Sequence, residues 1–533
     1  MRPRGERVRY AAVVAASSMV VAACGGGGGD ADSASDKKAD TGPQKQGGSL
    51  TVLAEVGYNG AWPAGLDPAT NTNGAANQSY MTSIFGQLFE LREGGKIVPT
   101  LAAGYEAKKG GTEFDITLRP GVKFTDGAPF DAETVAWHFN RVLKSQCTCR
   151  PNWPTLKSVK AQGTDTVVIT FAAPNAAFID SLIVSNANWV ASKKSLDAMG
   201  ERAFRIKPVG AGPFKVVSNK LSSELVLERN PDYYKQGRPY LDKLTFKSIG
   251  GGDEAALQAM QAGQAQAYEN MSTPPLIDQA KKNDKFVVTQ TVGTSPYNIQ
   301  LNTNIPPFDE QKARDAIYYA TDSEAIREKL FQNRYPSTQS FTGEGGKFFM
   351  PTIPGYKTYD LAKAKALVQE MGGMSIDLGT IKVLVATQTI QALASQWQQA
   401  GIKVKLHNYD LAQLIQAFGG KWQSMLQTAG SYDPAAGVGV AFRYSSLSPF
   451  SGIKDKKLDG MMAQASGELE QDKRAQDYKE IAQYMSDNSV SPFLFSFAPA
   501  NLVVKGVQGP GLTTKLPAIV VTPTIPWEDV SAA

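Results

Sequence analysis

Three cysteines and two histidines are the residues of this chain best suited to act as nucleophiles, metal ligands or redox groups. Cys24 follows small residues near the N-terminus, while Cys147 and Cys149 are one residue apart. A CxC pair in an oxidising compartment forms a strained disulfide or stays as two thiols, and both remain open. Neither His138 nor His407 lies near the pair in sequence, which argues against a metal site. No cofactor is expected.

The sequence lacks the usual signatures of catalysis. It contains no GxSxG, HExxH or P-loop, and no GxGxxG followed by a suitably spaced acid. Loose carboxylates are expected by chance among 50 acidic residues. We therefore expect a binding protein and not an enzyme.

The N-terminus resembles a secretory signal. Arginines precede a short apolar run from Tyr10 to Val21, and Val21, Ala22 and Ala23 lead directly into Cys24. The run has about twelve residues, too few for a bilayer core, which needs roughly 20. A basic N-terminal segment, a short apolar run and small residues before a cysteine are together typical of a lipoprotein signal peptide. We expect cleavage after residue 23 and diacylglycerol on the Cys24 sulfur.

Residues 24–47 are expected to form a flexible tether. They contain mainly Gly, Ala, Ser, Asp, Lys and Gln, and cannot bury enough apolar surface to fold. Loss of residues 1–23 removes four Arg and one Glu, leaving 51 basic against 49 acidic residues. Because no basic tract interleaved with aromatic residues remains, nucleic acid is not expected as a partner.

The clearest change in the spacing of apolar residues, from a strand-like to a helical period, lies at residues 114–143. Its first five residues alternate apolar and polar side chains, which predicts a strand with one buried face. Turn residues follow at 119–121 and 126–127. From Asp131, an expected N-cap, apolar residues recur at helical spacing.

The segment LRPGVKFTDGAPFDAETV within this stretch closely resembles the signature of the family 5 extracellular solute-binding proteins of ABC importers, the peptide and nickel group. The family usually has a His where this chain has Thr125. Other blocks resemble the family in the same order: GSLTVL from 48, GLDP from 65, VGAGPFK from 209, SPYNIQLNT from 295 and YDLAKA from 359. Together they extend from about residue 48 to 507.

The resemblance implies an α/β fold of the periplasmic-binding-protein-like type II class, with two lobes and an additional inserted domain, the cluster C architecture. The implied divisions are lobe 1 (domain I) at 48–78, 208–288 and 500–533, inserted domain II at 79–207, and lobe 2 (domain III) at 289–499. Crossovers near Pro208, Val287 and Ala500 would form the hinge on which the lobes close.

The family's usual ligand anchor is missing from the sequence. In peptide-binding relatives, the ligand ammonium pairs with an Asp in a segment of the form W..D(Y/N)..P. Here Gln427 stands at the Trp position and Gly430 at the Asp position. Losing one partner of such a pair costs roughly 2–5 kcal/mol. Asp433 could substitute, although a structural Asx turn before Pro434 is favoured.

Other ligand contacts are expected by resemblance. The loop after the first strand faces the ligand in relatives, which makes Tyr58 and Asn59 candidates, with an ordinary polar loop as the alternative. For His407, a polar residue at a strand end is favoured over a metal ligand. The aromatic candidates for lining the site are Trp62, Tyr297, Tyr409, Trp422 and Tyr432.

The sequence therefore predicts a monomeric, lipid-anchored protein on the extracytoplasmic face of the cell membrane. It would capture a small solute, by default an oligopeptide or dipeptide, and deliver it to the transmembrane subunits of an ABC permease. Two alternatives stay open. One is a non-peptide solute such as an opine, a sugar conjugate or a metal chelate, and the other is a sensor or chaperone not coupled to transport.

Overall fold

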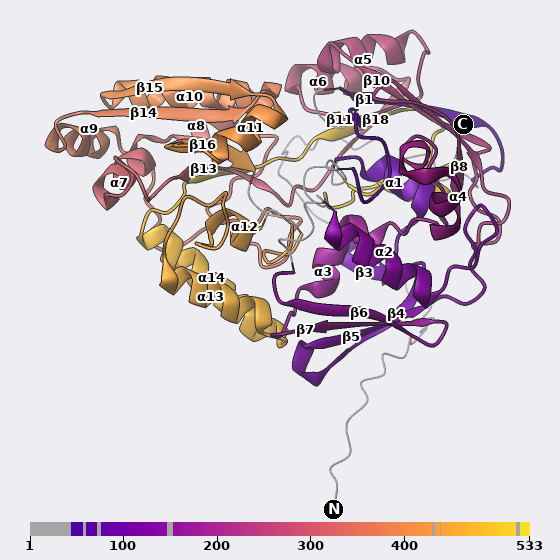
Figure 1. Cartoon of the computed structure of the whole chain (residues 1–533). Coiled ribbons are helices and arrows are strands. Elements are labelled where there is room, and N and C mark those ends of the chain that lie inside the picture. Colours follow the sequence, from indigo (N-terminus) through magenta and orange to yellow (C-terminus); the bar gives the residue numbers. More distant parts are fainter. Residues whose placement is uncertain are drawn as a thin grey trace, which may run out of the picture. The chain divides into compact units, whose positions relative to one another are not determined.

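The structure is a computed structural model that describes residues 44–56, 60–71, 76–145, 153–428, 432–437, 439–518 and 523–532. Three sheets of four or more strands organise these residues (Figure 1). None of the described helices is long and apolar enough to cross a membrane.

The largest sheet has seven strands in the order β12-β18-β11-β1-β10-β9-β8. Strand β1 lies near its centre and pairs in parallel with β10 and β11, whereas β18 pairs antiparallel with both β11 and β12. Its strands are β1 (Ser49–Glu55), β8 (Phe214–Lys220), β9 (Glu224–Arg229), β10 (Lys243–Ile249), β11 (Ala267–Met271), β12 (Phe286–Gln290) and β18 (Ala500–Val504).

A second sheet has five strands in the order β15-β14-β16-β13-β17. Strands β14, β15 and β16 run parallel, while β13 is antiparallel to β16. One face packs on helices, and the core there includes the completely buried Trp397. Its strands are β13 (Pro296–Leu301), β14 (Met374–Ile381), β15 (Ile402–Tyr409), β16 (Ser424–Thr428) and β17 (Phe493–Ser496).

The third sheet is antiparallel, with the order β4-β5-β7-β6, and the signature segment begins at the end of β5 and runs into α2. The predicted strand at 114–118 is confirmed as part of β5 (Glu113–Leu118), and the predicted helix as α2 (Ala132–Lys144). The Asp131 carboxylate accepts a hydrogen bond from the Thr134 N–H, as expected of an N-cap. The other strands are β4 (Ala102–Lys108), β6 (Leu156–Gln162) and β7 (Thr166–Phe171). A separate hairpin joins β2 (Phe89–Arg92) and β3 (Lys96–Pro99).

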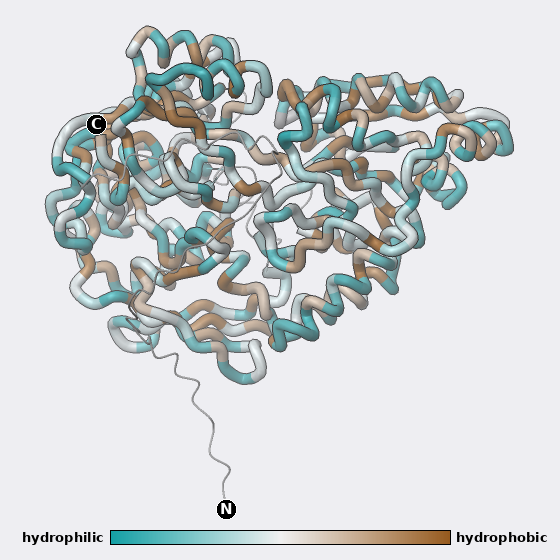
Figure 2. The backbone as a smooth tube through the Cα atoms, turned by 180° about the vertical axis from the view of Figure 1, so that it is seen from behind, coloured by the Kyte–Doolittle hydropathy of each residue, from teal (hydrophilic) through white to brown (hydrophobic). Residues whose placement is uncertain are grey.

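The remaining helices cover these sheets or connect their strands. Figure 2 shows hydrophilic residues along much of α13 and α14, as expected for helices with one face in water. These helices are α1 (Gln78–Phe85), α3 (Phe178–Leu182), α4 (Lys193–Phe204), α5 (Gly252–Gln261), α6 (Pro274–Lys282), α7 (Gln311–Ala320), α8 (Ser323–Phe331), α9 (Leu361–Glu370), α10 (Leu384–Gln399), α11 (Leu411–Phe418), α12 (Val440–Tyr444), α13 (Lys456–Gly467) and α14 (Gln471–Asp487).

The strands of each sheet can be compared with the predicted divisions, although β12 ends at Gln290, past the predicted end of lobe 1 at 288. The seven-stranded sheet uses residues from three separate parts of the chain, and the four-stranded sheet lies wholly within residues 79–207. The five-stranded sheet lies within 289–499. Whether these groups move as separate bodies stays a prediction.

A buried ion pair ties the GLDP segment to helix α2. The Asp67 carboxylate is fully buried and accepts two hydrogen bonds from the Arg141 guanidinium, at 2.7 and 2.6 Å. It also accepts from the N–H of Ala69 at 3.1 Å, which shapes the turn. This bidentate geometry compensates for burial of the Asp67 charge, while Arg141 is partly exposed.

We expect Asp67→Asn to lower the free energy of unfolding by about 1.5–3 kcal/mol, because it removes the buried charged partner of Arg141 and leaves it only the exposed Glu201, at 3.5 Å. Urea denaturation followed by circular dichroism measures the change. The control is Asp197→Asn in the exposed Lys193–Asp197 pair, for which we expect a loss of at most about 1 kcal/mol. Equal losses of unfolding free energy in the two variants would contradict a stabilising role for the Asp67–Arg141 ion pair.

Candidate functional site

Two chain segments cross between the seven-stranded and five-stranded sheets, and they run side by side. The first lies between β12 and β13, and the second between β17 and β18. The Thr291 N–H donates to the Pro499 carbonyl at 2.9 Å, and the Phe497 N–H donates to the Ser295 carbonyl at 3.2 Å. The crossings therefore hold the ends of the two sheets next to each other.

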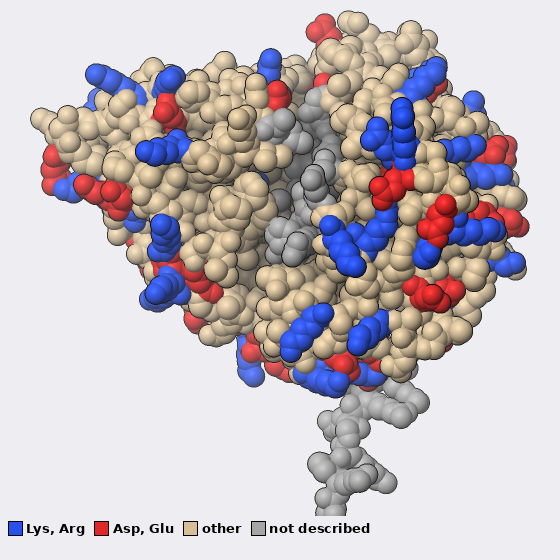
Figure 3. Space-filling model, viewed as in Figure 1, with Lys and Arg blue, Asp and Glu red and all other residues tan. Residues whose placement is uncertain are grey.

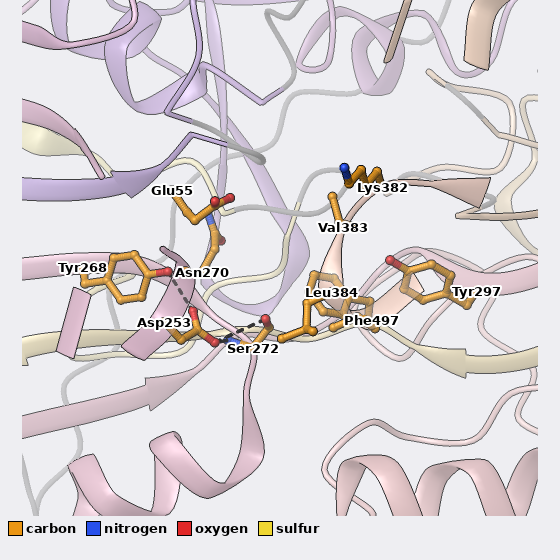
Figure 4. Close-up of a pocket in the computed structure, with 12 residues that line it drawn as sticks. Glu55, Asp253, Tyr268, Asn270, Ser272, Tyr297, Lys382, Val383, Leu384 and Phe497 are labelled. Atoms are coloured by element: carbon orange, nitrogen blue, oxygen red, sulfur yellow. Dashed lines mark hydrogen bonds between the residues drawn. The ribbon is translucent and has the colours of Figure 1, made fainter. Parts of the chain in front are cut away.

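A cavity of about 160 Å³ lies beside these crossings (Figure 4). The seven-stranded sheet and α5 supply one side of it, and the five-stranded sheet, the start of α10 and the second crossing supply the other. Its lining residues are Glu55, Gly252, Asp253, Tyr268, Asn270, Ser272, Tyr297, Lys382, Val383, Leu384, Val385 and Phe497.

Asp253 shapes this cavity but is already occupied by protein groups. Its carboxylate accepts hydrogen bonds from the Tyr268 hydroxyl at 2.7 Å and the Ser272 N–H at 2.8 Å (Figure 4), and also from the Thr273 N–H at 2.7 Å. Burial, followed by the Asp253 charge, raises the pKa of Tyr268. Asp253 therefore positions the chain after β11 and is poorly placed to anchor a ligand.

Asn270 is the cavity residue whose polar atoms lack partners. Both Oδ1 and Nδ2 are buried, and neither has a hydrogen-bond partner among the described residues. The backbone is held at φ 69°, with the N–H of Asn270 donating to the Asn501 Oδ1 at 3.2 Å. An unpaired buried amide is costly unless something else completes its hydrogen bonds. The side chain thus offers a solute one donor group and one acceptor.

The cavity also carries one acidic and one basic residue from opposite sides. Glu55 is the last residue of β1, and Lys382 directly follows β14. Figure 4 shows these side chains projecting from different sheets. A solute carrying both a positive and a negative group would match this pair.

The remaining wall is apolar. The Tyr297 ring packs 5.3 Å from Phe495 and 5.9 Å from Phe497, measured between centroids. Burial raises the pKa of Tyr297, so its hydroxyl stays protonated at neutral pH. Leu384 is 53% exposed, which leaves apolar surface available to a ligand.

The candidates from the sequence are not gathered in one place. Tyr297 lines the cavity, whereas Trp62 is 1% exposed in the core, where its indole N–H donates to Asn219 at 2.8 Å. Tyr409 stacks on His407 with centroids 5.9 Å apart, and Trp422 packs against Phe418. Cys24, Tyr58, Asn59, Cys147, Cys149 and Gly430 lie outside the described residues.

Asp433 takes part in a buried ion pair. The Arg474 guanidinium donates to both of its carboxylate oxygens at 2.7 Å, and the Ala435 N–H donates to Oδ1 at 2.9 Å. The hydrogen bond from the Ala435 N–H forms the Asx turn that the sequence analysis favoured. Although burial alone would lower the pKa of Arg474, the Asp433 charge outweighs it and raises that pKa. Asp433 is thus committed to holding α14 against its own loop.

Tyr432 belongs to the same region, away from the cavity lining. Its hydroxyl donates to the Gly95 carbonyl, and its ring centroid lies 5.6 Å from the Lys347 ammonium. Lys347 forms an ion pair with Asp180 at 2.6 Å. Burial, and secondly the Asp433 charge, raises the pKa of Asp180 to about 6. These contacts join residues near β3 and α3 to the loops that precede α9 and α12.

Neither histidine has surroundings that suggest a metal site. No cluster of metal-ligating side chains occurs among the described residues. Burial lowers the pKa of His138 to about 4, and its ring nitrogens lie 3.3 Å from the Asn186 carbonyl and the Ala191 N–H. His407, near the end of β15, lies 3.1 Å from Asp377.

Sequence reasoning missed Glu55, Asn270 and Lys382. A usable signal existed, since ligands in open α/β sheets bind beyond the carboxyl ends of parallel strands. Glu55 ends β1 and Lys382 follows β14. Which strand ends meet, however, depends on the crossings and cannot be read from local pattern.

Comparison with known proteins identifies the family. Residues 96–449 match the model of the bacterial extracellular solute-binding proteins, family 5. The chain belongs to this family. As a family 5 solute-binding protein, it has the type II periplasmic-binding-protein fold and belongs to a non-catalytic group that operates outside the cytoplasm with ABC importers.

Relatives of this family 5 protein have names that indicate peptide-like solutes. It is 26% identical over 468 residues to di/tripeptide-binding protein 1 of Pseudomonas aeruginosa, covering 80% of this chain and 85% of the relative. It is 29% identical over 419 residues to the glutathione-binding protein GsiB of Pectobacterium atrosepticum, covering 75% and 76%. A dipeptide-binding protein from Pseudoalteromonas sp. SM9913, solved with Met-Leu, superposes with a TM-score of 0.78 at 18% identity, covering 91% and 100%.

We expect Asn270→Gly to weaken binding of a dipeptide roughly 10-fold while preserving the fold, because glycine adopts positive φ readily and only the amide is lost. Isothermal titration calorimetry measures the affinity. The matched control is Asn333→Gly, an exposed position at φ 55°, which should bind as the unaltered protein does. Unchanged affinity in Asn270→Gly would show that the amide does not contact the solute.

Proposed function

We propose that this protein captures a di- or tripeptide between its two lobes and delivers it to the transmembrane subunits of an ABC permease. The observation that carries the proposal is the cavity at the sheet crossings, which combines Glu55, Lys382 and the unpaired Asn270 amide. A peptide supplies an ammonium, a carboxylate and main-chain amide groups that complement these three side chains.

The size of the cavity supports a small solute. Its volume of about 160 Å³ lies below the ~300–1,000 Å³ typical of sites for drug-sized ligands. The di/tripeptide-binding and glutathione-binding relatives agree with solutes of this size.

The mechanism that we propose requires binding and no chemical reaction. Because residues of the seven-stranded and five-stranded sheets both line the cavity, a solute that contacts both would stabilise a closed arrangement over an open one. The paired crossings would serve as the hinge, with residues near Pro208 linking the inserted domain. The closed protein, a monomer, would then dock on the permease. It would bind neither ATP nor a cofactor and would catalyse no reaction.

The first experiment identifies the solute by native mass spectrometry. The protein without residues 1–24 is sprayed intact, and any bound molecule is released by denaturation. We expect a set of di- and tripeptides, because no side chain in the cavity selects one apolar side chain over others. Release of one defined non-peptide molecule would overturn the peptide assignment.

The main alternative is a non-peptide solute such as an opine, a sugar conjugate or a metal chelate. The observation in its favour is the absence of the family's ammonium anchor, since Gly430 and Gln427 replace the usual Asp and Trp. A sensor or chaperone role would use the same site. It would be recognised if the protein binds the solute but a strain that lacks its gene takes up that solute as well as the parent strain does.

We also propose that Cys24 anchors the protein to the membrane through lipid. We expect that Cys24→Ser shifts the protein from the membrane fraction to the soluble fraction, because the sulfur that would carry diacylglycerol is lost. Metabolic labelling with a fatty acid analogue should mark the unaltered protein and leave this variant unlabelled. Cys149→Ser is the control and should stay labelled; labelling of Cys24→Ser would refute the anchor.

A further inference from the structure

The predicted inserted domain, residues 79–207, contacts the predicted lobe 2, residues 289–499, at a place separate from the cavity. Tyr432 and Ala436 are buried in a hydrophobic core whose other buried members lie between residues 69 and 211. The Tyr432 hydroxyl donates to the carbonyl of Gly95, in the turn between β2 and β3. A side chain of lobe 2 is therefore part of the core of the inserted domain.

Gly95 fits closely against this tyrosine. A Cβ atom added at Gly95 would lie 2.8 Å from the Tyr432 hydroxyl oxygen and 3.2 Å from the ring carbon Cε2, so the ring would have to move. The preceding Gly94 has a similar backbone, with φ 71° against 74° at Gly95. A Cβ atom added at Gly94, however, would meet no atom of the described residues within 4 Å. The two glycines thus separate strain at positive φ from loss of the Tyr432 contact.

An ion pair adjoins the tyrosine. The Lys347 ammonium lies 2.6 Å from a carboxylate oxygen of Asp180, which belongs to α3 in the inserted domain. The main-chain N–H of Lys347 donates to the Tyr432 carbonyl at 2.7 Å, so both side chains are held by one stretch of lobe 2. Because Asp180 is buried, Lys347 offsets a charge that is costly to remove from water.

Main-chain and apolar contacts extend the same junction. The Ala176 N–H, just before α3, donates to the Ser466 carbonyl near the end of α13 at 2.8 Å. Leu469 lies over Gly111, where an added Cβ atom would be 2.9 Å from the leucine Cδ2. Figure 1 shows the end of α13 reaching the four-stranded sheet. Together these contacts form a clasp, which pairs Tyr432, Lys347, Ser466 and Leu469 of lobe 2 with Gly95, Asp180, Ala176 and Gly111 of the inserted domain.

The inserted domain is also fastened to lobe 1. Arg141 pairs with Asp67, and Arg92 lies 3.2 Å from Asp529 near the C-terminal end of the chain. The clasp residues neither line the cavity nor belong to the crossings. If lobe 2 rotates about the crossings, the inserted domain would stay with lobe 1 and the clasp would separate.

We propose that the clasp is a second closure contact, which forms when the cavity closes and raises the affinity for solute without touching it. This inference rests on the proposed capture of a solute between two lobes. When only the closed form binds well, the apparent dissociation constant is the intrinsic one divided by the closed fraction. Tyr432, which the sequence analysis placed among the lining candidates, is then a positioning residue.

The first test compares Gly95→Ala with Gly94→Ala by isothermal titration calorimetry, with the peptides Met-Leu and tri-alanine as probes. We expect Gly95→Ala to bind both peptides roughly 10-fold less tightly, because a smaller closed fraction weakens every solute by the same factor. Gly94→Ala carries the same kind of backbone strain and should bind as the unaltered protein does. Weakening by clearly different factors for the two peptides would overturn the inference.

The second test alters the clasp from lobe 2. Lys347→Met removes the counter-charge of the buried Asp180 in the closed form, so it should also weaken both peptides by a common factor. The matched control is Lys357→Met, which loses an ion pair with Asp315 at 3.5 Å that lies wholly within lobe 2. We expect that control to lower the melting temperature and keep both affinities. If Gly95→Ala does not fold, the lysine variants decide.

Small-angle X-ray scattering of the solute-free protein provides the remaining measurement. If the free protein is already mostly closed, weakening the clasp should increase the radius of gyration of Gly95→Ala and Lys347→Met but not of their controls. Unchanged peptide affinities together with an unchanged radius in both variants would overturn the inference. If neither peptide binds the unaltered protein, the proposed peptide function fails. In that case the radii alone decide whether the clasp holds the lobes together, and equal radii would overturn it.

Discussion

The two crossings between the sheets are the constraint on which the site depends. Each carries the chain from one sheet to the other, and main-chain hydrogen bonds at Thr291 and Phe497 couple them. Because they are coupled, the ends of β1, β11, β13 and β14 meet around one cavity. A solute in this cavity would therefore be contacted from both sheets by residues that are hundreds of positions apart, and a change in the crossings would alter all of these contacts together.

Compensation of buried charge separates the structural residues from the candidate functional ones. Asp67 with Arg141 and Asp433 with Arg474 form bidentate pairs that fasten loops to helices. Asn270 is also buried, but its side-chain amide lacks hydrogen-bond partners among the described residues. On the face shown in Figure 3, acidic and basic side chains are interspersed, so surface charge gives no comparable indication of the ligand.

The sequence predicted local structure well where period and turn residues agreed, as at β5 and α2. The resemblance supplied the family and the fold, which the match over residues 96–449 confirms. Among the aromatic candidates chosen by residue type, Tyr297 lines the cavity. Glu55, Asn270 and Lys382 could not be identified, because strand ends from different sheets converge only through the crossings. Trp62 is a candidate that the sequence suggested and that the structure places away from the cavity lining. An aromatic residue beside a ligand-facing loop looks like a contact, yet here it packs against Tyr80 in the core at 4.8 Å.

Strand β18 has a consequence for how the molecule is made. It contributes residues 500–504, yet it lies between β11 and β12 inside the seven-stranded sheet. That sheet cannot close until residues 500–504 have been synthesised, long after β1 at residues 49–55. Such long-range pairing slows folding, since loop-closure entropy is lost before the contacts form. The seven-stranded sheet therefore stays incomplete while the segments between β1 and β18 are synthesised, which suits a protein that operates outside the cytoplasm.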